Sequence, residues 1–140
     1  LNELIPVYVE QLAPMAADRG LELSIDEQAQ LWVKAPSRVI QIILTNLLRN
    51  AINYTQQGSV VVRIRKNTIS VIDTGIGMSP EELQHAFEPF YRGERSRASS
   101  MGHGLGLSIV RRLVHQFDWP IHVQSNVGKG TEVTIEFFEG

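Results

Sequence analysis

The sequence predicts an α+β fold, a two-layer sandwich in which helices lie on one face of a single mixed, largely antiparallel sheet. Three observations predict it. Stretches with apolar residues at three- and four-residue spacings, typical of helices, alternate along the chain with short β-branched runs, typical of strands. Most strand-like runs lie in neighbouring pairs, as antiparallel strands commonly do. With 140 residues, 43% of them hydrophobic, the chain can bury one core, so we expect one domain over residues 1–140.

The apolar patterns predict the elements in order. We expect a helix over residues 1–19, strands over 21–25 and 31–33, a helix over 37–55, a hairpin of strands over 59–65 and 68–72, a short helix over 79–86, a helix over 105–117, and strands over 121–123 and 131–138. Pro6 and Pro14 predict a break or kink in the first helix, and Gly20 predicts its end. Ser37 is the expected N-cap of the second helix. Residues 92–103 have no periodicity and predict a mobile loop.

Composition excludes several classes of function. The formal net charge of -2 and the pI near 6.1 leave no broad basic surface, so we expect neither nucleic acid nor an anionic membrane as a partner. The absence of cysteine excludes disulfides and thiolate metal sites and suits a reducing compartment. The longest apolar runs are far shorter than a membrane span. Because the chain begins with Leu1 rather than Met, we expect it to be a fragment of a longer protein.

Three asparagines mark the helix expected over residues 37–55. Asn46, Asn50 and Asn53 are spaced at i, i+4 and i+7, which places them in one line beside the apolar stripe. Asparagine forms helices poorly, so three of them in line beside a core-facing stripe indicate a functional row of carboxamides. Three solvated side chains on a helix surface are the alternative.

Two glycine-rich stretches lie where phosphates are commonly bound. Residues 73–78 read DTGIGM and leave a predicted strand, and residues 102–107 read GHGLGL and open a predicted helix. Glycines let backbone N–H groups approach a phosphate closely, and a helix N-terminus adds partial positive charge. Either stretch alone could be an ordinary turn or helix cap. Residues 128–131 read GKGT and are not a P-loop, because the upstream glycine is missing and a glycine follows the lysine.

These features occur in a definite order. The asparagine helix is followed by DTGIG at residues 73–77, FEPFYR at residues 87–92 and GHGLGL at residues 102–107. In this order and spacing, nearly the whole chain resembles the catalytic ATP-binding domain of bacterial sensor histidine kinases, in the superfamily that includes DNA gyrase, the ninety-kilodalton heat-shock chaperones and the mismatch-repair ATPases. The resemblance implies the Bergerat-type ATP-binding fold, with ATP and Mg²⁺ as cofactors.

The resemblance also implies roles for the matching residues. The expected nucleotide-binding residues are Asn46, Asn50, Asn53, Tyr54, Asp73, Gly75, Gly77, Arg92, Gly102, Gly104, Leu105, Gly106, Leu107 and Thr131. Asn50 would offer its side-chain oxygen to Mg²⁺, which prefers hard oxygen ligands, with Asn46 beside it near the metal and the phosphates. Asp73 would accept a hydrogen bond from the adenine amino group, and Thr131 would help to hold that edge. Asn46 and Arg92 are the expected catalytic residues, acting by positioning and charge screening.

Three positions depart from the family pattern. ATPases of the superfamily commonly carry a water-activating glutamate at the position of Asn46; a carboxamide cannot act as a base, so transfer to a protein acceptor is favoured over hydrolysis. Family members often have a lysine at the position of Asn53, so one phosphate contact loses its usual residue. Ala35 stands where an aspartate is frequent.

None of the four histidines, His85, His103, His115 and His122, lies in the family's phosphoacceptor motif. The resemblance therefore implies transfer of the γ-phosphoryl group of ATP to a histidine on a separate dimerisation domain of the parent protein, which signals to a response regulator in a two-component system. We expect a monomeric fragment from the cytoplasmic part of a homodimeric parent anchored in the bacterial inner membrane. The alternatives are a nucleotide-gated interaction module and a serine-kinase or ATPase relative of the same superfamily.

Overall fold

The computed structural model describes residues 4–31, 33, 35–55, 57–75 and 106–137. Its helices and strands are, in order, α1 (Ile5–Asp18), β1 (Glu22–Glu27), α2 (Ser37–Tyr54), β2 (Ser59–Arg65), β3 (Thr68–Asp73), α4 (Gly106–Gln116), β4 (Ile121–Asn126) and β5 (Gly130–Glu136). The short helix expected over residues 79–86 and the loop expected over 92–103 lie outside the described residues.

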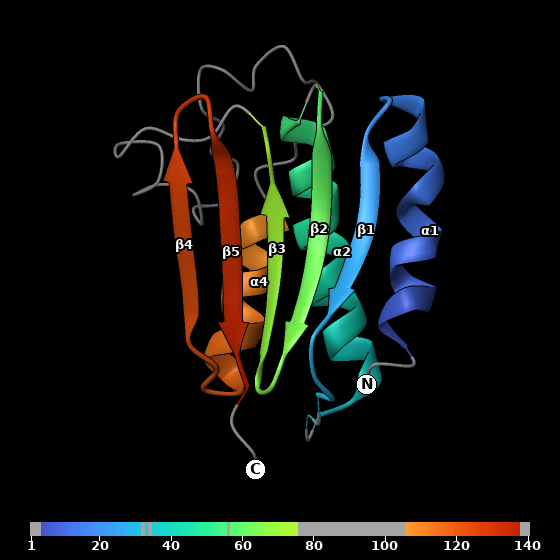
Figure 1. The fold of residues 1–140 in the computed structure, drawn as a ribbon. Helices are drawn as coiled ribbons and strands as arrows, with labels where there is room; N and C mark the ends of the chain where they lie inside the picture. The colour runs from blue at the N-terminus through green and yellow to red at the C-terminus, as the bar shows by residue number, and fades with distance from the viewer. Residues whose placement is uncertain (1–3, 32, 34, 56, 76–105, 138–140) are drawn as a thin grey trace.

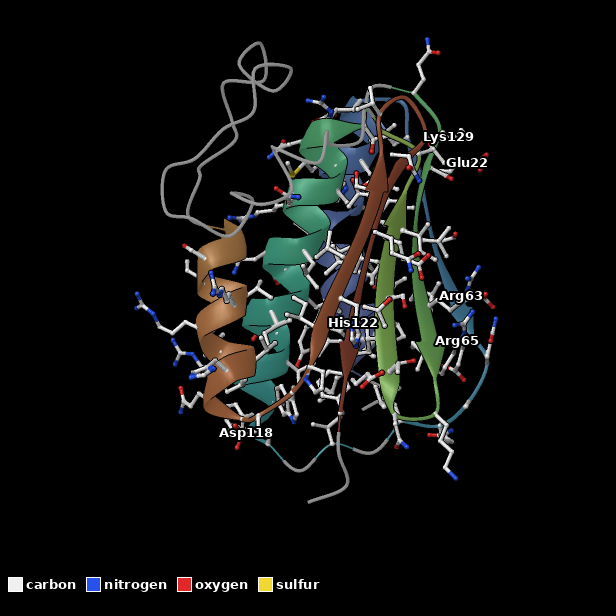
Figure 2. All side chains as sticks on the ribbon, turned by 90° about the vertical axis from the view of Figure 1, so that its left-hand side faces the viewer. Glu22, Arg63, Arg65, Asp118, His122 and Lys129 are labelled. Atoms are coloured by element: carbon white, nitrogen blue, oxygen red, sulfur yellow. The ribbon has the colours of Figure 1, made fainter. Side chains whose placement is uncertain are left out.

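The described strands form one sheet in the order β1-β2-β3-β5-β4. Strands β1 and β2 are parallel, and the other neighbouring pairs are antiparallel. Helices α1, α2 and α4 all lie against the same face of the sheet, as Figure 1 shows from the open face and Figure 2 from the side. The expected fold class, a two-layer α+β sandwich with one mixed, largely antiparallel sheet, is confirmed.

Alternation of side chains explains why the sheet has one covered and one open face. In β2, Val60, Val62 and Ile64 are fully buried under the helices, whereas Arg63 and Arg65 lie on the open face (Figure 2). A shift of one residue in the pairing register would turn the apolar set toward water. The core therefore fills the space between the sheet and the apolar faces of the helices.

Helix α1 runs through Pro14 without the break that the sequence predicts. Pro6 lies in the first turn, where a missing N–H is tolerated. Pro14 cannot donate to the carbonyl of Glu10, but both residues are exposed, so water can take that bond while the apolar face stays packed. The helix ends as expected before Gly20, whose φ of 70° is in the left-handed region.

Two expectations for the connection between β1 and α2 are wrong. Leu31 and Val33 lie outside any strand, and Leu31 is fully buried, because this segment inserts one apolar side chain into the core instead of pairing with the sheet. Ser37 is not an N-cap: Pro36 takes that position with φ of -59° and ψ of 136°, and no side-chain cap bond is made. Ser37 is therefore the first helical residue.

The remaining described elements confirm the sequence patterns. Strands β2 and β3 form the expected hairpin, with Asn67 at a φ of 68° in its turn. Helix α4 and strands β4 and β5 lie where they are expected, with bounds that differ by a few residues. No helix in the described ranges is both long enough and apolar enough to cross a membrane.

Candidate functional site

The predicted site residues in the described part of the chain gather at one end of the molecule. Helix α2 and strand β3 both end there, β5 begins there, and the N-terminal end of α4 points the same way (Figure 1). Helix α2 packs against both α4 and β3. The fold thus brings the asparagine line of α2 to the same end as Asp73, Gly75 and Thr131.

The covered face of the sheet changes from apolar to polar at this end. Strands β3, β5 and β4 place Val71, Val133 and Val123 in one row across the sheet. The next row toward the site is Asp73, Thr131 and Ser125. Directly opposed residues of antiparallel strands share a face, so this row faces the helix layer as the valines do. Polar groups thus replace the core where β3 ends and β5 begins.

Asp73 is buried, and only one of its two carboxylate oxygens accepts hydrogen bonds from the described residues. Its Oδ1 atom accepts hydrogen bonds from the backbone N–H of Gly75 at 2.9 Å and of Thr131 at 3.2 Å. Neither bond uses Oδ2, which has no protein partner among the described residues. Burial raises the pKa of Asp73, and the two N–H donors oppose that rise. A ligand with an N–H donor would meet a carboxylate that is already held in place by these two bonds.

Thr131 is held by Ser125. The Ser125 hydroxyl donates to the carbonyl of Gly130 at 3.1 Å and lies 2.8 Å from the Thr131 hydroxyl oxygen. Because a hydroxyl has one proton, a Ser125 that donates to Gly130 must accept from Thr131, so the Thr131 oxygen keeps its capacity to accept. Asp73 Oδ2 and Thr131 Oγ1 then form a pair of acceptors at neighbouring positions of β3 and β5.

Two glycines allow the backbone around Asp73 to pack closely. Gly130 has a φ of 110°, and a Cβ there would overlap the carbonyl oxygen of Asp73. Gly58 has a φ of 114°, and a Cβ there would overlap Oγ1 of Thr74. That Thr74 oxygen accepts the N–H of Ser59 at 3.1 Å, which fixes the chain just after Asp73 to the start of β2.

Four residues around Asp73 have no predicted role in the site: Gly58, Thr74, Ser125 and Gly130. Gly130 could have been found, because it directly precedes the predicted Thr131 in the GKGT stretch. The other three carry no local pattern, since their contacts join segments far apart in the chain.

The three asparagines of α2 differ in exposure. Asn53 is buried, with 8% of its surface exposed, whereas Asn46 and Asn50 are half-buried beside the apolar stripe. The Asn46 amide nitrogen donates to the carbonyl of Ile42 at 2.7 Å, which leaves its side-chain oxygen as the atom to meet a ligand. The row consists of amides without an acid, and the Oδ1 atom of Asn53 is itself buried. The described residues contain no cluster of three His, Asp or Glu side chains suited to a metal.

These oxygens fit Mg²⁺ bound together with a nucleotide. Mg²⁺ prefers hard oxygen ligands, keeps several waters and shares its coordination with phosphates, so one or two protein oxygens suffice. Asn50 and Asn46 are the residues that would hold it. The buried Asn53 lies one turn beyond Asn50, at the end of the helix.

The other predicted residues are described only in part. Gly106 and Leu107 form the start of α4, and the N-terminal end of a helix favours an anion. Tyr54 is the last residue of α2. The side chains of Tyr54 and Leu107, and the whole of Gly77, Arg92, Gly102, Gly104 and Leu105, lie outside what the structure describes.

Known proteins match this chain over most of its length. The model of the family described as histidine kinase-, DNA gyrase B- and HSP90-like ATPase matches residues 35–139. Sensor histidine kinase YclK of Bacillus subtilis is 35% identical over 142 residues, covering 96% of this chain and 30% of YclK. Autoinducer 2 sensor kinase/phosphatase LuxQ of Vibrio cholerae is 36% identical over 147 residues, covering 97% of this chain and 17% of LuxQ. The chain thus spans less than a third of the length of either relative.

Solved structures agree with this match. Full-length ShkA, crystallised in complex with AMPPNP, superposes with a TM-score of 0.83 at 28% identity, covering 96% of this chain and 29% of ShkA. The mycobacterial sensor histidine kinase MprB superposes with a TM-score of 0.82 at 27% identity, covering 96% of this chain and 92% of that one. The chain therefore belongs to the family of histidine kinase-, DNA gyrase B- and HSP90-like ATPases, and within it represents the catalytic ATP-binding domain of a bacterial sensor histidine kinase.

Proposed function

We propose that this chain binds Mg²⁺-ATP at the end formed by α2, β3, β5 and α4, and presents the γ-phosphoryl group to a histidine on a separate dimerisation domain of its parent protein. The observation that carries the proposal is the buried carboxylate of Asp73, with one oxygen on two backbone N–H groups and the other without a partner among the described residues. The exocyclic amine of adenine supplies the N–H donors that this carboxylate and Thr131 would accept. Guanine presents a carbonyl oxygen at that position, so ATP is favoured over GTP.

The metal and phosphate side of the site would come from α2 and α4. Asn50 and Asn46 would hold Mg²⁺, which when bound neutralises the charge of the phosphates during transfer. The start of α4 would direct its backbone N–H groups toward the phosphates. Gly77, Arg92, Gly102, Gly104 and Leu105 remain predicted contacts.

Transfer to a protein is favoured over hydrolysis of ATP. The Asn46 amide nitrogen is bound to the Ile42 carbonyl, and a carboxamide has no basic lone pair with which to activate water. Activity would therefore need an acceptor that brings its own nucleophile, and a histidine of the dimerisation domain provides one. The parent would be a homodimer anchored in the bacterial inner membrane, with this domain in the cytoplasm, and would signal to a response regulator.

Phosphotransfer to an added acceptor domain tests the proposal. The chain is incubated with Mg²⁺ and γ-labelled ATP, first alone and then with the purified dimerisation domain of its parent. We expect very slow hydrolysis and no label on the chain alone, and labelling of the acceptor domain that is lost when its histidine is replaced by alanine. Asn50→Ala should abolish the transfer.

Other outcomes would contradict parts of the proposal. Label on any of the chain's own four histidines would contradict the need for a separate acceptor. Tight ATP binding without transfer would instead identify a nucleotide-gated interaction module.

A further inference from the structure

The C-terminal end of α2, which carries Asn50 and Asn53, is held by donors from outside the regular helix. The last carbonyls of any α-helix have no partner within the helix. Here Thr55 Oγ1 donates to the carbonyl of Ala51 at 2.7 Å, and the Thr55 N–H donates to the carbonyl of Ile52 at 3.3 Å. The carbonyl of Asn53 instead accepts from the side chain of Arg19, at 3.2 Å from its Nη2.

Arg19 reaches α2 from a fixed position at the end of α1. Its backbone N–H donates to Ala16 at 3.1 Å. The following Gly20 and Leu21 donate to Ala17 and Ala16, both at 3.0 Å, which completes a Schellman turn. The backbone from which the Arg19 side chain departs is therefore set by α1 and not by α2.

The Arg19 side chain donates a hydrogen bond to α2 and is not part of an ion pair among the described residues. No carboxylate of the described residues forms an ion pair with it. Its Nε atom is buried without a partner in the described structure, an arrangement that costs stability. Helix α2 has no basic residue in its own last turn, so a cation brought to Asn53 by α1 also meets the negative end of that helix dipole.

We propose that Arg19 is a positioning residue of the nucleotide site, which holds the last turn of α2 so that the side-chain oxygen of Asn50 stays in place for Mg²⁺. The inference rests on the proposed function. Helix ends fray when their carbonyls lose their partners, and Asn53 lies in the turn that Arg19 holds. Arg19 itself need not touch the nucleotide.

The test compares Arg19→Met with Arg19→Lys and with Arg63→Met. Methionine keeps the apolar stem of arginine and removes every donor, and lysine keeps the charge and a donor. Arg63 pairs with Asp26 at 2.9 Å on the open face of the sheet, so its replacement removes a charged hydrogen bond far from α2 (Figure 2). Circular dichroism verifies that each variant is folded; if Arg19→Met is not, Arg19→Gln replaces it, because its amide is too short to reach Asn53.

Two measurements report on position and on binding. Amide hydrogen exchange at residues 51–54 should become about tenfold faster in Arg19→Met, while residues 44–48 of the same helix keep their protection. Affinity for a non-hydrolysable ATP analogue should fall about tenfold in the presence of Mg²⁺ and less than threefold in EDTA. Arg19→Lys should recover most of the Mg²⁺-dependent affinity, and Arg63→Met should bind as the wild type does.

Three results would overturn the inference. Wild-type affinity of Arg19→Met with Mg²⁺ would show that the helix end does not need Arg19. An equal loss with and without Mg²⁺ would assign Arg19 to the general stability of the fold. Failure of the wild-type chain to bind the analogue at all would overturn the proposed function and with it this inference, whatever the exchange data show for the helix end.

Discussion

Asp73 is a buried carboxylate, which is costly, and one of its two oxygens can still accept a hydrogen bond from a ligand. Its carboxylate is buried, and its pKa is raised because burial disfavours the charged form. Both of its hydrogen bonds end on Oδ1, so Oδ2 has no protein partner in the described part of the chain. A bound adenine amine would supply the missing donor.

Asp73→Asn should separate binding from folding. The Oδ1 of asparagine can still accept from Gly75 and Thr131, which places its Nδ2 donors where Oδ2 would face the adenine amine. We expect a folded protein whose ATP affinity is about 5-fold to 150-fold weaker, since a buried unmatched donor costs about 1–3 kcal/mol. Calorimetric titration measures the loss. Asp26→Asn, on the open face of the sheet, is the matched control and should bind ATP normally; equal affinity of the two variants would remove Asp73 from the site.

The raised pKa of Asp73 predicts a characteristic pH dependence. The folded state holds the Asp73 proton more tightly than the unfolded state, whose reference pKa is 3.8. Its contribution to the free energy of unfolding is therefore fully present below pH 3.8 and is lost as pH rises through the folded-state pKa. ATP binding should change in the opposite direction and weaken as pH falls through the same pKa, because the charged carboxylate is the better acceptor.

Comparison with Asp73→Asn isolates this titration from the other acids. Urea unfolding and ATP titration of both proteins are measured from about pH 3 to pH 7, a range that spans the ordinary values for carboxyl groups. As pH falls through the folded-state pKa of Asp73, the wild type should gain free energy of unfolding relative to the variant and should lose ATP affinity relative to it. A difference that is constant over the range would mean that the pKa of Asp73 is the same in the folded and unfolded states.

At the scale of elements, the β3–β5 pair depends on Gly130. Gly130→Ala forces a Cβ against the Asp73 carbonyl, whereas Gly128→Ala, at a φ of 80°, meets nothing within 4 Å. Both changes incur the penalty of a left-handed alanine, roughly 1 kcal/mol. Gly130→Ala should therefore lose clearly more stability in urea unfolding, and it should also weaken ATP binding by moving Asp73. Equal losses for the two glycines would show that the backbone relaxes without cost.

The backbone just after α4 is strained at Asp118, a non-glycine residue with a positive φ. Asp118 has a φ of 58° at the position after the helix cap, where Trp119 donates to Val114 at 2.8 Å and Asp118 donates to His115 at 3.2 Å. Its acidic side chain also lies at the C-terminal, negative end of the helix dipole (Figure 2). Asp118→Gly should raise the free energy of unfolding by about 0.5–1 kcal/mol. Gly20→Ala, at the equivalent position of α1, should lower it by a similar amount, and a loss of stability in both variants would contradict this account.

Local patterns predicted most of the described elements and failed where a neighbour decided the outcome. Strand β2 was predictable because every second residue is apolar, and α2 because its apolar residues follow a helical period. Leu31 was misassigned because a short apolar run does not reveal whether it pairs in a sheet or inserts into a core. Ser37 was misassigned because Pro36 already supplies the extended backbone that precedes the helix.

For the molecule as a whole, motifs in the sequence predict candidate site residues but not their arrangement. Asn50, Asp73 and Thr131 are predicted by motifs that occur in a characteristic order. Asp73 and Thr131 lie side by side because β5 pairs with β3 and β4 takes the edge of the sheet. No local pattern in the sequence predicts this strand order. The contact from Arg19 to Asn53 joins residues 34 positions apart and was equally invisible.

Nucleotide binding should stabilise the whole fold, because the proposed site joins α2 to β3 and β5. With a non-hydrolysable ATP analogue and Mg²⁺ at about 100 times Kd, we expect the free energy of unfolding to rise by about 2.7 kcal/mol. Urea unfolding followed by circular dichroism measures the change. Removal of Mg²⁺ with EDTA should reduce it, and Asp73→Asn should show a clearly smaller increase at the same analogue concentration. No increase in the wild type would contradict binding at this site.

Helix α1 begins and β5 ends at the end of the molecule opposite the site (Figure 1). Any segment that precedes α1 or follows β5 therefore attaches on the far side from Asp73 and the asparagines. A rotation of the whole domain about such an attachment displaces the nucleotide end more than any other part, since displacement grows with distance from the pivot. In the proposed transfer, the reach of the γ-phosphate toward an acceptor would then depend on the angle of the connecting segment.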